Sequence, residues 1–172
     1  MQQERLGRLI EPIHDAALAF ARCLCRSRAD GDDLFQESLV RALDKLETLR
    51  DDNAFRHWLY RVIVSVHRNR CRRSFWSRLV PLGDREVAGE DFSRGVDRAR
   101  AALATLPPEQ RETIVLFEIE GWQIDEIAAL HGVSASAVKS RLVRGRDRLR
   151  TFYTKQLGIG DVTPILVPGD SP

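Results

Sequence analysis

The chain of 172 residues has no apolar run approaching the roughly 20 residues that a membrane-spanning helix needs. Its first residues, MQQERLGRLIEP, also lack the apolar centre of a signal peptide. Only three cysteines occur, and without a signal peptide they are expected to be reduced thiols. We therefore expect a cytoplasmic protein that does not insert into a membrane.

The sequence also lacks the short motifs of several enzyme classes. It contains no Gly-rich phosphate-binding loop, no HExxH and no paired set of cysteine ligands. We therefore expect no catalysis, no metal and no cofactor. One weak alternative is a metal or redox site in which Cys23 or Cys25 joins His67 and Cys71, which lie four residues apart on a predicted helix. Buried structural cysteines are the more ordinary interpretation of this pattern.

Acidic and basic residues gather in separate stretches, although the net charge is only +2. Residues 32–52 hold seven acids and three bases, whereas residues 53–83 hold seven arginines and no acid. Residues 84–120 are acidic again, nine against five, and residues 139–150 hold six Lys or Arg and one acid. Two basic stretches separated by acidic ones predict two contacts with nucleic acid and at least one basic protein partner.

The stretch from Gly121 to Arg150 predicts two short helices that meet at a tight turn. Gly132 supplies a residue that turns freely, and Ser134 supplies a side-chain oxygen to cap the second helix. Val138 and Leu142 then fall on the buried side of that helix, opposite its basic face. This is a helix-turn-helix pattern, although an ordinary helical hairpin with a solvated basic face has the same spacing.

Helical spacing of apolar residues also runs through the N-terminal part of the chain. Residues from about 5 to 27 predict a helix bent near Pro12. A turn at Ala29–Gly31 is expected to lead into a second helix, with Asp32 and Asp33 in the first turn, where the helix dipole favours acids. Taken alone, this acidic helix is typical of a solvated surface.

The next segment, AFRHWLYRVIVSVHRNRCRR, mixes aromatic residues with arginines. Such a mixture is typical of a hydrophobic core with a basic rim. It is also what a single-stranded nucleic acid requires, because unstacked bases need flat partners and the backbone needs positive charge. Both interpretations stand at this point.

Residues 74–95 contain Pro and Gly among mixed charges and show no sustained period, which indicates a linker between residues 1–73 and 96–155. In the second part, Pro108 is expected at an early helical position. Residues 156–172 are expected to form a flexible tail. The chain is therefore predicted to be all-α, with two small helical domains joined by a linker.

Gly145 lies inside the last predicted helix. Glycine there should cost on the order of 1 kcal/mol of helix stability, unless close packing requires it.

Three segments together resemble the extracytoplasmic-function (ECF) sigma factors of bacterial RNA polymerase, within the sigma-70 family. They are DDLFQESLVRA, FRHWLYRVIVSVHRNRCRR and LPPEQRETIVLFEIEGWQIDEIAALHGVSASAVKSRLVRGRDRLR. With their surroundings they cover roughly residues 5–73 and 96–152, in the family's order. The resemblance implies a subunit that binds core RNA polymerase and directs it to promoters through their −10 and −35 elements.

The resemblance also implies roles for three sets of residues. The set expected to grip the clamp helices of the largest polymerase subunit is Asp32, Asp33, Gln36 and Glu37. The set expected to bind and melt the −10 element is Asn53, Phe55, Trp58, Tyr60, Arg61, Ser65, Arg68 and Asn69. The set expected to bind the −35 element is Ser136, Lys139, Ser140, Arg141, Val143, Arg144, Arg146 and Arg148. Loop 49–54 is expected to capture a flipped base of the −10 element.

The partners implied by the resemblance are core RNA polymerase, including its flap tip, promoter DNA and an anti-sigma protein. The alternative is a free-standing helix-turn-helix regulator that uses residues 121–150 alone. The acidic face beside the aromatic and arginine-rich segment favours the sigma factor, because a simple regulator has no need of it.

Overall fold

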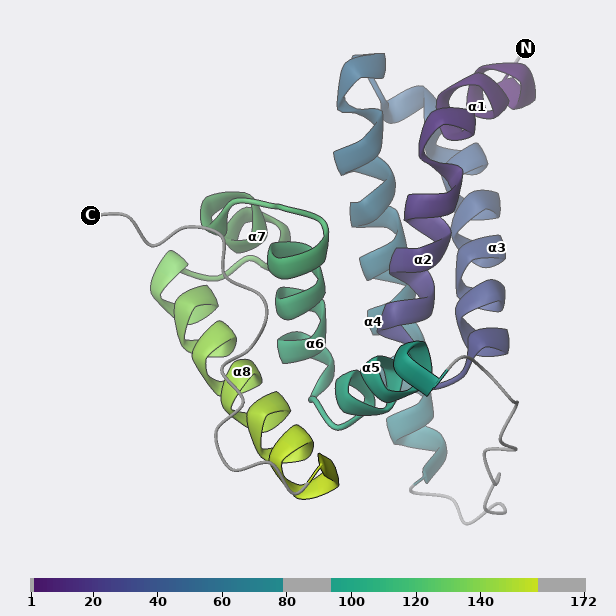
Figure 1. Ribbon diagram of the computed structural model, residues 1–172. Coiled ribbons are helices and arrows are strands. Elements are labelled where there is room, and N and C mark those ends of the chain that lie inside the picture. Colours follow the sequence, from purple (N-terminus) through teal and green to yellow (C-terminus); the bar gives the residue numbers. More distant parts are fainter. Residues whose placement is uncertain (1, 79–93, 158–172) are drawn as a thin grey trace. The chain divides into compact units, whose positions relative to one another are not determined.

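The computed structural model describes residues 2–78 and 94–157, with the backbone alone for residues 74–78, 94–97 and 157. Every regular element in these ranges is a helix or a helical turn, which confirms the predicted all-α class (Figure 1). Two compact units are present, Met1–Asp91 and Phe92–Pro172. Most of the predicted linker and tail lie outside the described residues. No helix in the described ranges is long and apolar enough to cross a membrane.

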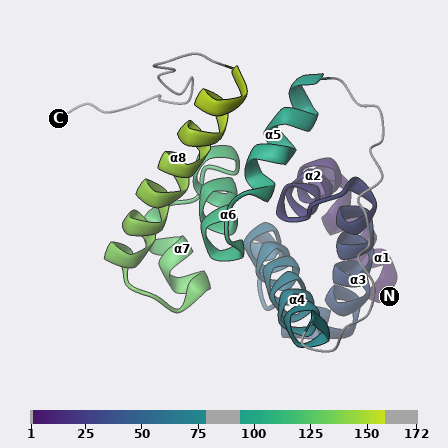
Figure 2. The same ribbon diagram turned by 90° about the horizontal axis from the view of Figure 1, so that it is seen from below.

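The first unit packs α2, α3 and α4 side by side (Figures 1 and 2). Its elements are α1 (Gln2–Ile10), η1 (Glu11–Ile13), α2 (His14–Leu24), α3 (Arg28–Lys45), η2 (Leu46–Thr48), η3 (Asp52–Ala54) and α4 (Phe55–Arg78). The 3₁₀ turn η1 contains Pro12 and separates α1 from α2, so the predicted bend is confirmed. Helix α4 continues past residue 73, where the linker was predicted to begin.

The start of α3 differs from the prediction. The helix begins at Arg28, because Ser27 caps it: the Asp30 N–H donates to Ser27 Oγ at 3.0 Å. Ala29–Gly31 therefore lie inside the helix and do not form a turn. Asp32 and Asp33 fall in the second helical turn, so the argument from the helix dipole does not apply to them.

Gly31 is required by packing between helices. A Cβ atom at this position would lie 2.5 Å from Arg22 Cα and 2.8 Å from Arg22 Cγ on α2. The missing side chain thus lets α2 and α3 approach each other closely. A glycine that resembled a turn residue in the sequence marks a helix contact instead.

Aromatic rings fill the centre of the first unit. Phe20 of α2 and Tyr60 of α4 are buried, and their rings stack with centroids 4.5 Å apart. Phe55, at the start of α4, is only 3% exposed. The apolar residues around them are Leu24, Leu34, Phe35, Leu46, Leu59 and Ile63. This part of the aromatic segment is therefore hydrophobic core.

The second unit packs α6 and α7 against α8. Its elements are α5 (Arg94–Ala104), α6 (Pro108–Ile114), the π-helical turn η4 (Val115–Ile119), α7 (Ile124–His131) and α8 (Ala135–Leu157). Pro108 is the first residue of α6, as predicted. The buried Arg111 holds the end of α5, because its guanidinium donates to the carbonyls of Leu103, Ala104 and Leu106.

Gly145 of α8 lies against Ile114 of α6. A Cβ atom there would come within 2.8 Å of Ile114 Cγ1. Close packing therefore accounts for a glycine in the middle of this helix.

We expect Gly31→Ala to destabilise the first unit by about 1–3 kcal/mol, because the new methyl group would overlap the α2 backbone. Gly7→Ala is the matched control, since α1 is helical there and nothing lies within 4 Å of the added Cβ. That variant should be neutral or up to about 1 kcal/mol more stable. Urea unfolding followed by circular dichroism measures both changes, and equal effects would contradict the packing argument.

Candidate nucleic-acid and protein interfaces

The turn between α7 and α8 has the predicted helix-turn-helix geometry. Gly132 adopts a left-handed conformation with φ 63° and ψ 38°. The Val133 N–H donates to Ala128 O at 3.1 Å, and Ser134 Oγ accepts from the Ala137 N–H at 3.2 Å. The sequence-based assignments of Gly132 as turn and Ser134 as cap are both confirmed.

One face of α8 is exposed and polar. Val138 and Leu142 are 0% and 3% exposed and hold the helix to its unit. The side chains exposed on the other side include Ser136, Lys139, Ser140, Val143 and Arg144. Val143 is the apolar member of this face and is 56% exposed.

The arginines of α8 differ in how they are engaged. Arg146 forms an ion pair with Glu118, with Nη2 and Oε1 2.6 Å apart, and its guanidinium lies 5.7 Å from the centre of the Phe117 ring. Arg141 contacts His131. Arg144 and Arg148 are exposed, although Arg144 Nε also donates to the Ser140 carbonyl at 3.3 Å. The predicted −35 set thus contains side chains that also hold the unit together.

A buried polar chain joins α6, α7 and α8. Arg141 Nη1 lies 2.9 Å from His131 Nδ1. Because a guanidinium only donates, Nδ1 must accept and the ring hydrogen belongs on Nε2. His131 Nε2 faces Glu112 Oε2 at 3.5 Å, and both side chains are fully buried. Glu112 and His131 were not predicted from the sequence, and His131 holds the Arg141 side chain on the helix that presents the basic face.

The arginine-rich helix α4 also has a continuous outward face. Trp58, Arg61, Ser65 and Arg68 recur at helical spacing, and each is exposed or half-buried. Arg72 is exposed at the next position of this face, and the sequence analysis did not include it. Asn69 is half-buried beside them and accepts a hydrogen bond from the Arg72 guanidinium.

Two members of the predicted −10 set lie elsewhere. Phe55 and Tyr60 are 3% and 0% exposed, so the structure does not bring their rings to the face that carries Trp58 and Arg61. The Phe55 ring instead stacks on Trp58, with centroids 5.9 Å apart. Phe55 therefore supports an aromatic residue that is itself partly exposed.

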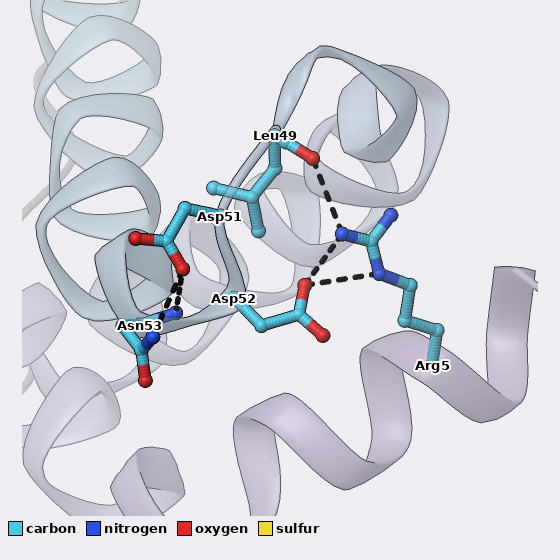
Figure 3. Close-up of polar contacts among 5 residues, drawn as sticks. All are labelled: Arg5, Leu49, Asp51, Asp52 and Asn53. Atoms are coloured by element: carbon cyan, nitrogen blue, oxygen red, sulfur yellow. Dashed lines mark hydrogen bonds and ion pairs between the residues drawn. The ribbon is translucent and has the colours of Figure 1, made fainter.

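The loop from Leu49 to Ala54 presents Asn53, another member of that set. Asn53 is exposed, and its backbone N–H and side-chain amide both donate to Asp51 Oδ1 at 3.0 Å (Figure 3). The side-chain carbonyl oxygen points away from Asp51 (Figure 3). The loop thus holds one amide in a defined orientation at the surface.

The acidic helix α3 divides its side chains between internal ion pairs and solvent. Asp32 Oδ1 lies 2.6 Å from Arg22 Nε, and Glu37 Oε2 lies 2.7 Å from Arg70 Nε. Asp33 and Gln36 are exposed. The Asp32 and Glu37 side chains are nevertheless 42% and 39% exposed, so all four members of the predicted polymerase-binding set reach the surface, and two of them do so while making ion pairs.

Val40 extends this exposed face by one turn. It lies seven residues after Asp33 and four after Gln36, and it is 64% exposed. Val40 thus adds an apolar side chain to a face that is otherwise polar. The spacing of Val40 from Asp33 and Gln36 is the sequence signal that places it on this face.

The cysteines show no metal-site geometry. All three are half-buried thiols. Cys71 Sγ lies 3.5 Å from His67 Nε2, but within residues 2–78 and 94–157 no group of three or more His, Cys, Asp or Glu residues is arranged to hold a metal ion. The structure therefore adds no support to the weak metal-site alternative.

Comparison with known proteins connects these faces to a family. The family model described as Sigma-70 region 2 matches residues 9–77, and the one described as Sigma-70, region 4 matches residues 97–149. The chain is 34% identical over 164 residues to the RNA polymerase sigma factor CnrH of Cupriavidus metallidurans, a match that covers 86% of this chain and 85% of the relative. It is also 32% identical over 158 residues to the ECF RNA polymerase sigma factor SigE of Mycolicibacterium smegmatis. The chain belongs to the ECF group of the sigma-70 family.

This chain spans less than two thirds of the length of the Mycolicibacterium smegmatis relative. The match to the Mycolicibacterium smegmatis protein covers 86% of this chain but only 61% of that relative. A solved structure, the sigma factor RpoE from Bartonella quintana in complex with the anti-sigma factor NepR, is similar with a TM-score of 0.68 and 25% identity, over 86% of this chain and 96% of the other. The predicted family is thus confirmed, and the comparisons do not favour a free-standing regulator.

Proposed function

We propose that this chain is a promoter-specificity subunit, which binds core RNA polymerase in the cytoplasm and directs it to promoters without catalysing a reaction itself. One observation carries the proposal. The helix-turn-helix unit belongs to the same ECF-family chain as a second unit. In that second unit α3 exposes an acidic and apolar face, and α4 exposes a basic face. A DNA-binding regulator would need only the helix-turn-helix.

The α8 face fits a −35 contact in the major groove. Lys139 and Arg144 supply donors that suit guanine edges, and Val143 supplies an apolar surface that suits a thymine methyl group. Ser136 and Ser140 add small hydroxyls, which donate or accept. Arg148 lies on the same basic helix and is assigned to phosphate contacts. Arg141 and Arg146 are assigned to phosphates as well, through the guanidinium donors that their internal contacts leave unused.

The α4 face and the loop before it fit a −10 contact. Arg61, Arg68 and Arg72 provide positive charge along one side of the helix, with Ser65 and Asn69 between them. Trp58, half-buried at the start of this face, provides a ring for stacking. Asn53 is assigned to an unpaired base of the −10 element. Phe55 and Tyr60 are buried and act indirectly, by holding α4 in place through the core.

The exposed face of α3 fits the polymerase. Asp33 and Gln36 supply polar contacts to the clamp helices, and Val40 supplies the apolar centre that a specific interface needs. Asp32 and Glu37 act indirectly by fixing α3 against α2 and α4. An additional contact between the helix-turn-helix unit and the flap tip is also proposed from the resemblance.

An anti-sigma protein is the proposed regulator. The Bartonella quintana neighbour was solved in complex with an anti-sigma factor. The exposed faces of α3 and α8 are the surfaces that such a protein would have to cover in order to block polymerase and promoter binding.

We expect Asp33→Lys to weaken binding to core RNA polymerase by at least about tenfold, because the change places a like charge against a basic partner. Asp33 makes no ion pair among the described residues, so the fold should persist. Glu11→Lys is the control: it makes the same charge change at an exposed position in η1. Fluorescence titration of labelled protein with purified core enzyme measures both affinities. Unchanged affinity in Asp33→Lys would remove α3 from the interface.

We expect Lys139→Ala and Arg144→Ala to weaken −35 binding selectively, by about 1–3 kcal/mol at the bases they contact. Arg148→Ala should weaken binding evenly across sequences and reduce the salt dependence. Holoenzyme binding to a library of −35 duplexes, sequenced before and after selection, separates the two patterns. A uniform loss in all three variants would refute the assignment of base contacts to Lys139 and Arg144.

A further inference from the structure

Arg5 of α1 makes a set of contacts that neither the sequence analysis nor the family roles include. Its Nη2 and Nε lie 2.5 and 3.1 Å from Asp52 Oδ1, and Nη2 also donates to the Leu49 carbonyl at 3.1 Å (Figure 3). One guanidinium from the N-terminal helix therefore binds the loop between α3 and α4 at two points.

The two points lie on either side of the bend in the loop. Leu49 follows η2 and is 6% exposed, whereas Asp52 opens η3. Arg50 and Asp51 lie between them. Since the guanidinium is a rigid planar fork, fixing both ends of this short segment restricts the conformations open to the residues between.

Asp51 in turn orients Asn53. Its Oδ1 accepts from both the backbone and side-chain nitrogen of Asn53 at 3.0 Å. Figure 3 shows Asp51, Asp52 and Asn53 around one bend, with Arg5 on the side of Asp52 and Leu49 and with the Asn53 carbonyl oxygen directed away from Asp51. An asparagine amide both donates and accepts, and this pairing suits the edge of an adenine.

We propose that Arg5 is a positioning residue for base selection: by clamping Leu49 and Asp52 it holds the loop in the conformation in which Asn53 meets an unpaired base. This inference rests on the proposed function, which assigns the loop to the −10 element. The ion pair is partly exposed, with Arg5 at 32% and Asp52 at 51%, so its effect should fall on loop geometry more than on global stability.

The first test measures the loop without any DNA. Trypsin cleaves after Arg50, which is exposed in the bend. We expect Arg5→Ala to raise the rate of cleavage between Arg50 and Asp51 by about fivefold, because the released loop opens more often. Arg8→Ala removes the same charge from an exposed site on the same helix and should leave this rate unchanged. Mass spectrometry of the early fragments identifies cleavage between Arg50 and Asp51. Equal cleavage rates in Arg5→Ala and Arg8→Ala would refute the proposal that Arg5 restrains the loop.

The second test uses holoenzyme and a single-stranded DNA pool with randomised bases. The wild-type protein should enrich one base at one position, and Arg5→Ala should reduce that preference by about fivefold while binding core polymerase normally. Arg5→Lys keeps the charge but not the fork and should lie between them. Equal preference in wild type and Arg5→Ala, despite faster cleavage of the loop, would refute the link to base selection.

The two tests separate this inference from the proposed function. If wild-type holoenzyme shows no base preference, the −10 assignment fails along with the role of Arg5 in selection. If wild type is selective and the Arg5 variants match Arg8→Ala in both assays, only the Arg5 inference fails.

Discussion

The guanidinium of Arg70 joins the two helices of the first unit that carry opposite charge. Arg70 on α4 lies 2.7 Å from Glu37 Oε2 on α3 and donates to the Asp33 carbonyl at 2.9 Å. These contacts lie beside the acidic face of α3, and Arg70 itself belongs to α4, which exposes the basic face. The Arg70 side chain thus links the helix that carries the acidic face to the helix that carries the basic face, in addition to the buried apolar contacts between them.

Other arginines among the described residues also make contacts within their own unit. Arg111 holds the end of α5, Arg141 meets the buried His131, and Arg146 pairs with Glu118. A charge that is satisfied inside its unit is less available to DNA, so charge along the sequence overestimates the DNA-binding surface. Arg61, Arg144 and Arg148 are exposed, so they are the arginines that the proposed promoter contacts can use directly.

Much of the fold could be predicted because local signals agreed with tertiary packing. Gly132 and Ser134 gave the turn and cap of the helix-turn-helix, and Pro12 and Pro108 marked a helix break and a helix start. The prediction of a turn at Gly31 was wrong, because this glycine lies inside α3 and allows α3 to approach Arg22 of α2 closely. Turn propensity and helix packing select the same residue type, and sequence spacing alone does not separate them.

The candidate site was harder to predict than the fold. The mixture of aromatics and arginines fitted both a core and a binding surface. In the structure Tyr60 stacks in the core, whereas Trp58 and Arg61 reach the outer face. Arg5 and His131 gave no local signal, because their partners lie 47 and 10 residues away. Contacts of this kind depend on how helices meet, which a helical period does not encode.

The central claim is that this chain works as a specificity subunit of RNA polymerase. Transcription by purified core enzyme, with and without this protein, on a pooled library of upstream regions from the source genome tests it most directly. The account predicts protein-dependent transcripts with discrete start sites, preceded by two shared elements at a constant spacing. Binding to DNA without core polymerase, and no new start sites in its presence, would contradict it.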